Sequence, residues 1–249
     1  MTNVQPPLIV IPARLAATRL PNKPLADING KPMIVHVWER AVEANLGPVI
    51  VACGDQEIYE VVLAHGGEAV LTDPALPSGS DRVKVAADLF DPQGLYPIIL
   101  NVQGDVPTLD PALLQACLEP FEKTSLLDIA TLATEIQDPD ELKDPNVVKI
   151  AAAMDIQDDI GQALYFSRNV LPFGEGPHYH HVGLYAYRRE ALQHFVMLPV
   201  HPLEAREKLE QLRALANGMS IHVKVIHGPV PFGVDTQEDL ERAIEILRS

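Results

Sequence analysis

The fold is decided by the stretch Pro97-Ile98-Ile99-Leu100-Asn101-Val102, which is the strongest candidate for a buried strand in the chain. A short apolar run followed by a polar loop is typical of a strand that is covered on both faces. Apolar residues at helical spacing precede it at Ser80–Phe90, where a Ser favours a helix start, and follow it from Pro111 to about Glu122. A strand between two helices predicts a parallel sheet covered by helices.

The same alternation of strand and helix extends outward from this stretch toward the amino terminus. It predicts an α/β fold with helices on both faces of the sheet, joined by right-handed crossovers. Ligands of such sheets bind at the carboxyl ends of the strands, so the loops after Ile11, Cys53 and Val102 are the candidate site. The further elements expected here are strands at Leu8–Pro12 and Val49–Ala52 and helices at Pro32–Asn45 and Gln56–Ala64.

The second half of the chain is less regular. It contains no internal repeat and no clear linker, which favours one domain with an inserted subdomain. Surface turns are expected at Asp158–Gly161 and Phe173–Pro177. The expected strands are Ile129–Thr134, Val147–Ala152, His181–Tyr187 and Ile221–Ile226, and the expected helices are Leu203–Ala216 and Gln237–Leu247.

Composition places the chain among ordinary globular proteins. Of its 249 residues, 47% are hydrophobic and 21% are charged, and no apolar run approaches the roughly 20 residues of a membrane-spanning helix. Met1–Pro7 lacks the pattern of a signal peptide, so we expect a cytoplasmic protein. Cys53 and Cys117 have no metal-binding spacing, which favours buried thiols in a reducing compartment over a zinc site.

The net charge of −15, from 34 acidic and 19 basic residues, restricts the partners. Such a surface repels polyanions, so nucleic acid and membrane insertion are not expected. A small anionic substrate remains possible if a few cations are concentrated around it.

One loop concentrates cations in this way. The segment Pro12–Leu25, after the first strand, contains Arg14, Arg19 and Lys23 and no acidic residue. Guanidinium groups bind phosphates bidentately and Lys supplies a point charge, so the loop suits a triphosphate. It matches neither the P-loop nor the dinucleotide-binding pattern, and a solvated basic turn is an equal alternative on spacing alone.

Two carboxylates could complete such a site. Asp105 follows the strongest strand within Asn101–Pro107, and Asp235 precedes the last helix within Phe232–Thr236. Magnesium prefers one or two carboxylates together with phosphate oxygens and water. An ordinary turn for Asp105 and a helix cap for Asp235 are the alternatives, and the cap is the commoner role. Spacing alone does not bring the two together.

A polar strand face and a polar helix stripe occur in the second half of the chain. Alternation in His181–Tyr187 puts His181, Gly183 and Tyr185 on one face, which suits a hydroxylated ring, although a lone His is more often a core residue. In Leu203–Ala216, a stripe of Glu204, Glu207 and Gln211 is by itself more often a solvated face.

Together these segments resemble the CMP-Kdo synthetase family, the 3-deoxy-manno-octulosonate cytidylyltransferases. The resemblance runs from about Leu8 to the carboxyl terminus, and CMP-sialic acid synthetases share the fold and the opening loop but not the full set of motifs. The motifs are IPARLAATRLPNKPL (Ile11–Leu25), INGKPMIVHVWERA (Ile28–Ala41), SGSDR (Ser78–Arg82), NVQGDVP (Asn101–Pro107), DPNVVK (Asp144–Lys149), ALYFSR (Ala163–Arg168), HHVGLYAYRREAL (His180–Leu192), PLEAREKLEQLRAL (Pro202–Leu215) and GVDTQEDLERA (Gly233–Ala243).

The resemblance implies an α/β, nucleotide-diphospho-sugar transferase-like three-layer fold with a mixed, mostly parallel sheet and an inserted subdomain for dimerisation and sugar binding. It implies a homodimer. Within the single domain 1–249, about 8–125 would bind the nucleotide, about 126–230 would bind the sugar and the partner, and 231–249 would return to the active site.

The activity that the resemblance implies is transfer of CMP from CTP to 3-deoxy-D-manno-octulosonate (Kdo), giving CMP-Kdo and pyrophosphate for lipopolysaccharide biosynthesis. Two Mg²⁺ ions are implied, one held by the protein and one carried by CTP. The implied catalytic residues are Lys23, Asp105 and Asp235, with both aspartates as metal ligands. The implied nucleotide-binding residues are Pro12, Ala13, Arg14, Lys23, Ser78, Gly79 and Arg82, and the implied sugar-binding residues are Gln103, Arg168, His181, Tyr185, Glu210 and Gln211.

The chain departs from the family pattern at Val106, Ser80-Asp81, Cys53-Gly54-Asp55 and His201. These departures leave room for a related sugar acid, such as 8-amino-Kdo or a sialic acid. A non-catalytic nucleotide-sugar sensor would show a missing metal carboxylate or a broken cationic loop, and both features are intact. A purely structural α/β module does not explain the clustered cations.

Overall fold

Four parallel strands, in the order β5-β4-β1-β6, form the sheet of the amino-terminal part. The computed structural model describes residues 6–16, 20–124, 126–155, 157–228 and 230–248. Leu8–Ile11 and Ile99–Leu100 have no exposed surface, as expected for strands covered on both faces. The strands are β1 (Leu8–Ala13), β4 (Val49–Cys53), β5 (Glu68–Leu71) and β6 (Ile98–Asn101).

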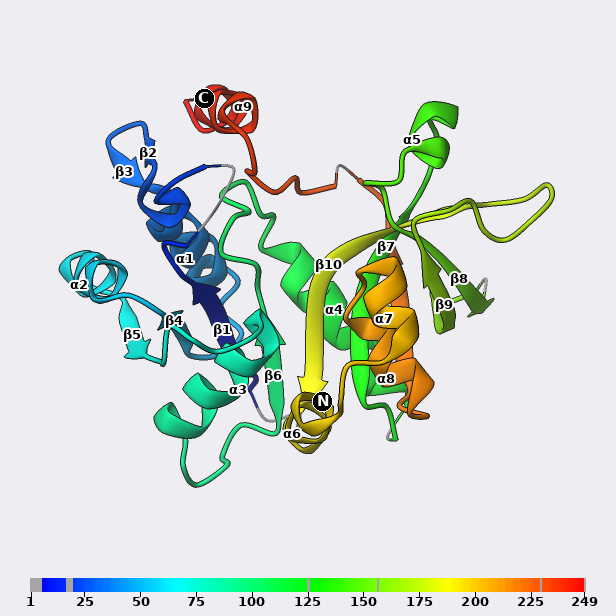
Figure 1. The fold of residues 1–249 in the computed structure, drawn as a ribbon, viewed down its shortest axis with the longest axis horizontal. Helices are drawn as coiled ribbons and strands as arrows, with labels where there is room; N and C mark the ends of the chain where they lie inside the picture. The colour runs from blue at the N-terminus through cyan, green and yellow to red at the C-terminus, as the bar shows by residue number, and fades with distance from the viewer. Residues whose placement is uncertain (1–5, 17–19, 125, 156, 229, 249) are drawn as a thin grey trace. The chain divides into compact units, whose positions relative to one another are not determined.

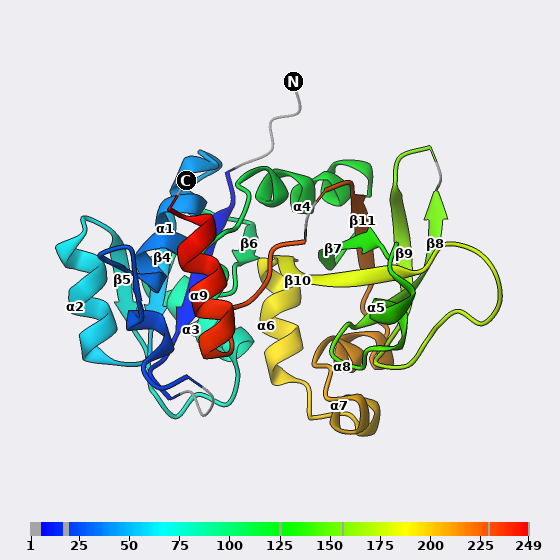
Figure 2. The same ribbon diagram turned by 90° about the horizontal axis from the view of Figure 1, so that it is seen from above.

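Three helices connect these strands. The chain moves outward from β1 to β5 through α1 (Met33–Glu43) and α2 (Gln56–Ala64), then returns to β6 through α3 (Gly79–Phe90). Right-handed crossovers therefore put α3 on the opposite face from α1 and α2, and Figure 2 shows α1 and α3 on either side of β1. The predicted α/β class is confirmed, whereas the cap of α3 is Ser78 rather than Ser80.

The chain divides into two compact units, Met1–Gln115 with Pro231–Ser249, and Ala116–Val230. The carboxyl-terminal segment joins the first unit because its apolar residues pack there. Val234, Leu240 and Ala243 share a buried cluster with Ile28 and Met33. The remaining elements of this unit are η1 (Lys23–Leu25), β2 (Asp27–Ile28), β3 (Lys31–Pro32) and α9 (Gln237–Ile246).

The second unit has a sheet of order β10-β7-β11-β9-β8 (Figure 1). The pair β7–β11 is parallel, and the neighbouring pairs are antiparallel, so the sheet is mixed as predicted. Strand β10 also pairs with β8. The strands are β7 (Ile129–Glu135), β8 (Lys149–Asp155), β9 (Ile160–Ser167), β10 (Tyr179–Arg188) and β11 (Ile221–Ile226). The helices are α5 (Pro139–Lys143), α6 (Arg189–Met197), α7 (Pro202–Glu207) and α8 (Gln211–Ala216). The division between the two units falls within α4 (Ala112–Lys123).

The single helix expected at Leu203–Ala216 is wrong. Lys208 adopts a left-handed conformation with φ of 56°, which ends α7 and separates it from α8. Arg213 of α8 donates to both carboxylate oxygens of Glu204, at 3.0 and 2.9 Å, and this pair folds α8 back against α7. Glu204 is therefore a structural residue rather than part of a solvated stripe, and so is Glu207, whose carboxylate accepts from Ser167 Oγ and from the Arg168 amide.

Two strand predictions also need correction. Strand β9 was not expected, and its first residues, Ile160 and Gly161, fall inside the turn expected at Asp158–Gly161. Strand β8 begins at Lys149 rather than Val147, because residues 144–147 form a turn that the Lys149 side chain holds through two carbonyls.

Strand β10 keeps His181 and Tyr185 on one face although its pairing with β7 shifts register between them. His181 pairs with Ala133 and Tyr185 with Thr131, so both project to the same side of the sheet, while Gly183 lies where the register shifts. Thr131 has no exposed surface and supports the irregular backbone, since its Oγ1 donates to the Leu184 carbonyl at 2.8 Å. The same oxygen lies 3.0 Å from His181 Nε2.

Across the described residues, no helix is both long enough and apolar enough to cross a bilayer.

We expect Thr131→Val to lower the free energy of unfolding by about 1–3 kcal/mol, because it leaves a buried carbonyl without its donor. Denaturant unfolding measures this loss. Thr134→Val is the control on the same strand, since it removes one bond of 3.3 Å to Ile226. An equal effect of the two substitutions would contradict the role given to Thr131.

Candidate active site

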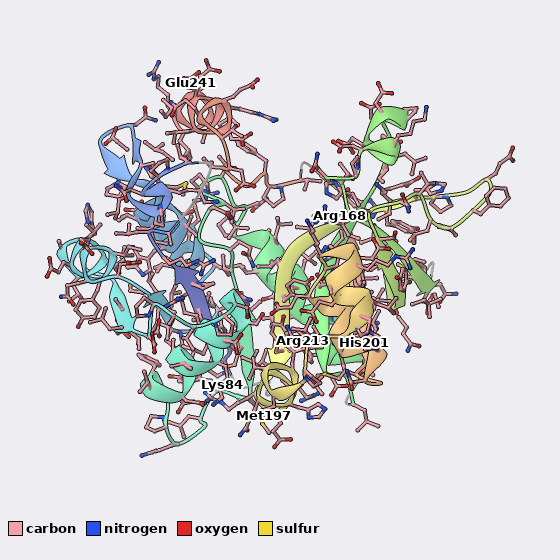
Figure 3. All side chains as sticks on the ribbon, viewed as in Figure 1. Lys84, Arg168, Met197, His201, Arg213 and Glu241 are labelled. Carbon is pink, nitrogen blue, oxygen red and sulfur yellow. The ribbon has the colours of Figure 1, made fainter. Side chains whose placement is uncertain are left out.

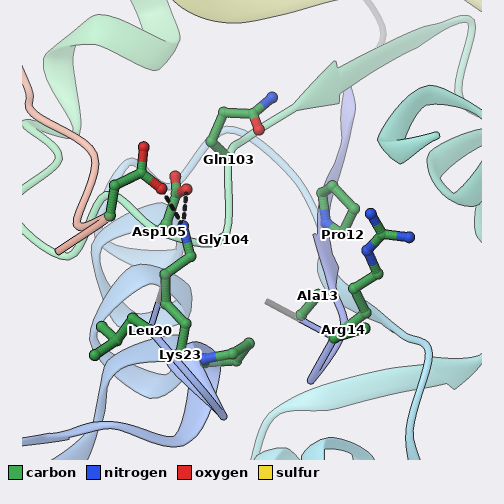
Figure 4. Close-up of a pocket in the computed structure, with 11 residues that line it drawn as sticks. Pro12, Ala13, Arg14, Leu20, Lys23, Gln103, Gly104 and Asp105 are labelled. Carbon is green, nitrogen blue, oxygen red and sulfur yellow. Dashed lines mark hydrogen bonds and ion pairs between the residues drawn. The ribbon is translucent and has the colours of Figure 1, made fainter. Parts of the chain in front are cut away.

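A cavity of about 500 Å³ opens beyond the carboxyl ends of β1 and β6 in the first unit (Figure 4). This is the position that the parallel sheet predicts for a ligand. It is lined by Pro12, Ala13, Arg14, Ala16, Leu20, Lys23, Pro24, Gln103, Gly104, Asp105 and Asp235. The cavity brings together seven residues for which the sequence predicts a role. Gln103 was expected to contact the sugar, and the six expected to bind nucleotide or metal are Pro12, Ala13, Arg14, Lys23, Asp105 and Asp235.

The ammonium group of Lys23 bridges the two aspartates. Its Nζ lies 2.6 Å from Oδ2 of Asp105 and 2.9 Å from Oδ1 of Asp235, which are 82 and 212 residues away in the chain. Burial lowers the pKa of Lys23, but the attraction of the two carboxylates outweighs burial and leaves that pKa raised. Lys23 is therefore fully charged at neutral pH, and the two carboxylates converge on one cation.

Backbone contacts set the position of each aspartate. The Val234 amide donates to the Asp105 carbonyl at 2.8 Å, which ties the carboxyl-terminal segment to the loop after β6. Thr236 caps α9 by accepting from the Asp239 amide, and the Asp239 carboxylate accepts from the Asp235 and Thr236 amides. The alternative that Asp235 is the helix cap is therefore wrong.

Gly104 allows the loop after β6 to approach β1. A Cβ at this position would lie 2.7 Å from the Pro12 carbonyl oxygen, closer than atoms of a side chain and backbone tolerate. A residue with a side chain would move the loop and with it Asp105.

Arg14 lies across the cavity from Lys23 and Asp105 (Figure 4). It is exposed and forms no ion pair with any residue that the structure describes. The neighbouring Leu15 amide donates to Oδ2 of Asp55 at 2.7 Å, which anchors the loop. Sequence reasoning marked the loop after Cys53 but missed this role of Asp55. Arg19 lies outside the described residues.

The segment expected to read the base adjoins the cavity without lining it. A Cβ on Gly79 would lie 3.8 Å from Pro12 Cγ, so the start of α3 rests against the cavity wall. Ser78 accepts from the Asp81 amide and donates to the Asp81 carboxylate. Arg82 is 2% exposed and donates through Nη1 to Thr72 Oγ1 and the Asp73 carbonyl, so its guanidinium holds the 72–74 turn.

The donor set for a metal consists of the two aspartates. Within the described residues, no three His, Cys, Asp or Glu side chains converge as metal ligands. Two carboxylates that already surround a single cationic nitrogen suit Mg²⁺, which takes its other ligands from phosphate and water. A zinc site, which uses three or four protein ligands, does not fit this set.

Arg168, in the second unit, is held by backbone groups. Its Nε donates to the Glu207 carbonyl and its Nη1 to the Pro145 carbonyl, each at 2.8 Å. The Glu207 carboxylate accepts from the Arg168 amide and from Ser167 Oγ. Figure 3 shows Arg168 at one end of α7 and His201 at the other.

His181 and Tyr185 are adjacent, with ring centroids 5.4 Å apart. Burial, reinforced by the charge of His180, lowers the pKa of His181 to about 3, so its imidazole is neutral at pH 7. Burial, with Tyr187 and Glu210 nearby, raises the pKa of Tyr185 well above its usual value. Both side chains therefore offer neutral hydrogen-bonding groups, and the Tyr185 hydroxyl makes no hydrogen bond with the described residues.

Glu210 and Gln211 follow the break between α7 and α8. Glu210 forms an ion pair of 3.3 Å with Arg213. Gln211 is 7% exposed, and its side-chain amide has no partner among the described residues. Its amide nitrogen and oxygen reach solvent, although the residue as a whole is nearly buried, and they can bind a hydroxylated ligand.

Comparison with known proteins identifies the family. A family model described as Cytidylyltransferase matches residues 8–221. The chain belongs to the cytidylyltransferase family. It is 56% identical to the 3-deoxy-manno-octulosonate cytidylyltransferase of Paramagnetospirillum magneticum over 98% of both chains, and 59% identical to that of Rhodospirillum centenum over 97% and 93%. A solved CMP:2-keto-3-deoxy-manno-octonic acid synthetase complexed with CTP superposes with a TM-score of 0.89 at 36% identity, over 98% of both chains.

In this cytidylyltransferase, Gly104→Ala is expected to displace the loop that holds Asp105. We expect the free energy of unfolding to fall by about 1–3 kcal/mol, as for other forced overpacking, together with a loss of nucleotide binding. Gly183→Ala is the control, because no atom lies within 4 Å of the added Cβ. Thermal unfolding and CTP titration measure both effects, and unchanged CTP affinity in Gly104→Ala would contradict the proposed constraint.

Proposed function

We propose that this cytidylyltransferase joins CTP to Kdo and produces CMP-Kdo and pyrophosphate. The observation that carries the proposal is the convergence of Asp105 and Asp235 on one cation in the cavity beside Arg14. The high identity to 3-deoxy-manno-octulosonate cytidylyltransferases over nearly the whole chain supports the same sugar.

The cavity residues have roles in nucleotide binding. The Arg14 guanidinium is unpaired among the described residues and faces the cavity, so it is available for triphosphate oxygens. Lys23 neutralises phosphate charge from the opposite wall once the aspartates release it. Ser78, Gly79 and Arg82 shape the adjoining wall on which the base would rest.

The reaction is an in-line displacement at the α-phosphorus. The oxygen of the sugar 2-hydroxyl forms a bond to phosphorus, its proton passes to solvent, and the bond to the pyrophosphate oxygen breaks. Catalysis is mainly positioning and neutralisation of charge, as in phosphoryl transfer generally. Within the second unit, the neutral His181, Tyr185 and Gln211 would orient sugar hydroxyls, Glu210 would bind a further hydroxyl, and Arg168 would serve the sugar carboxylate. Gln103 lines the cavity of the first unit and would serve the reacting sugar there.

Asp105 and Asp235 would hold Mg²⁺. Two carboxylates within hydrogen-bond distance of one nitrogen form a site in which one cation can replace another. Bound there, Mg²⁺ would lower the pKa of the sugar hydroxyl and neutralise the α-phosphate, and a second ion would arrive with CTP. Lys23 then takes part by leaving the aspartates for the phosphates.

Asp105→Asn and Asp235→Asn are each expected to lower kcat more than about a hundredfold, a loss of a few kcal/mol of transition-state stabilisation. The measurement is pyrophosphate release with CTP, magnesium and Kdo, with 8-amino-Kdo and a sialic acid as alternative acceptors and the other NTPs as alternative donors. Asp110→Asn, at an exposed carboxylate of the same unit, is the control. Near-normal release by either active-site variant would overturn the assignment.

Lys23→Met is expected to make the protein depend on divalent metal for stability. Without the ammonium the two carboxylates repel each other, and we expect a loss of about 1 kcal/mol, since solvent screens Asp235, which is 43% exposed. Added Mg²⁺ should raise the melting temperature of this variant more than that of the wild type, because nothing competes for the site. Lys31→Met breaks an exposed pair with Glu39 and should show no such gain. An equal effect of Mg²⁺ on wild type and Lys23→Met would count against the metal site.

We also propose a cytoplasmic homodimer that supplies CMP-Kdo for lipopolysaccharide biosynthesis. Cys53 and Cys117 are buried free thiols, as suits a reducing compartment. Leu164, Val170 and Phe173 of the second unit are exposed apolar side chains, which favour a partner surface there.

A further inference from the structure

Lys149, the first residue of β8, has no exposed surface. Its Nζ donates to the carbonyls of Asp144 and Val147, at 2.7 and 2.6 Å. Among the described residues, no carboxylate forms an ion pair with it. Burial lowers the pKa of Lys149, with Arg168 adding to the effect and Asp144 opposing it.

A buried ammonium without a carboxylate partner is a costly way to hold a turn. Taking a charge out of water is unfavourable, and carbonyl dipoles compensate for it only in part. A neutral donor such as an amide or a hydroxyl would hold the same carbonyls at lower cost. The charge itself therefore requires an explanation.

The place of Lys149 in the sheet connects it to the residues proposed for the sugar. It pairs with Ser167 on β9 and with His180 on β10, so its two neighbours directly precede Arg168 and His181. The His181 amide donates to the carbonyl of Val148 at 2.8 Å.

Lys149 and Arg168 also hold the same turn. Arg168 Nη1 donates to the Pro145 carbonyl, between the two carbonyls that Lys149 binds. Both side chains thus donate to carbonyl oxygens of one turn. The two positive charges repel each other, the Asp144 carboxylate attracts Lys149 without forming an ion pair among the described residues, and an anion beside the turn would be attracted to both cations.

We propose that Lys149 is a positioning residue that selects an acidic sugar: it fixes the 144–147 turn on which Arg168 rests and adds, beside Arg168, a positive charge that no ion pair with the described residues neutralises. The inference rests on the proposed function, because it assigns the carboxylate of the sugar acid as the anion that this positive charge attracts. In a chain of net charge −15, an anionic sugar needs such a local source of positive potential.

The test compares Kdo with its neutral carboxamide in the pyrophosphate assay. For Lys149→Met we expect the preference for the acid over the amide to fall at least about tenfold, through a higher KM for Kdo, with the KM for CTP unchanged. Lys149→Arg keeps the charge and should restore most of the preference. Lys123→Met, at an exposed lysine of the same unit, is the control and should retain it fully.

An equal loss on the acid and the amide would show that Lys149 only packs, and would overturn the inference. If Lys149→Met does not fold, the preference of Arg168→Gln for the acid over the amide tests the inference instead. Because Lys149 is still present in this variant, we expect part of that preference to remain. Complete loss of the preference would overturn the inference. Absence of pyrophosphate release by the wild type with every sugar acid would instead overturn the proposed function, and this inference with it.

Discussion

The candidate active site depends on one ammonium group shared by two carboxylates. Lys23 draws together a loop after the first strand, a loop after β6 and a segment near the carboxyl terminus. The buried cluster around Val234 and Met33 brings the last segment to this position, and the bond between the Val234 amide and the Asp105 carbonyl fixes it there. The aspartates are thus arranged for a cation before any nucleotide arrives.

The positions of a few cations explain how a chain with a net charge of −15 can bind anionic substrates. Arg82 and Lys149 are buried cations that donate to a hydroxyl and backbone carbonyls, and within the described residues neither forms an ion pair with a carboxylate. Arg14 is exposed to the cavity and likewise lacks a carboxylate partner. These three cations therefore differ from Arg213 and Lys31, which form ion pairs with glutamates.

The amino-terminal elements follow from the sequence because strongly apolar strands such as Ile98–Asn101 alternate with helices of clear period. The break at Lys208 was not predictable, since a left-handed Lys leaves no signal in the pattern and depends on the pair between Arg213 and Glu204. At the site, the cationic loop and Asp105 could be found from their place after strands. Sequence alone could not join Asp235 to them, and the roles of Asp55 and Lys149 depend on tertiary contacts that leave no local signal.

A crystal structure with CTP and Mn²⁺ tests the central claim most directly, because anomalous scattering locates the manganese. We expect an anomalous peak between Asp105 and Asp235, with the Lys23 ammonium moved onto the triphosphate. Manganese elsewhere, with Lys23 still bridging the two carboxylates beside bound CTP, would contradict the account.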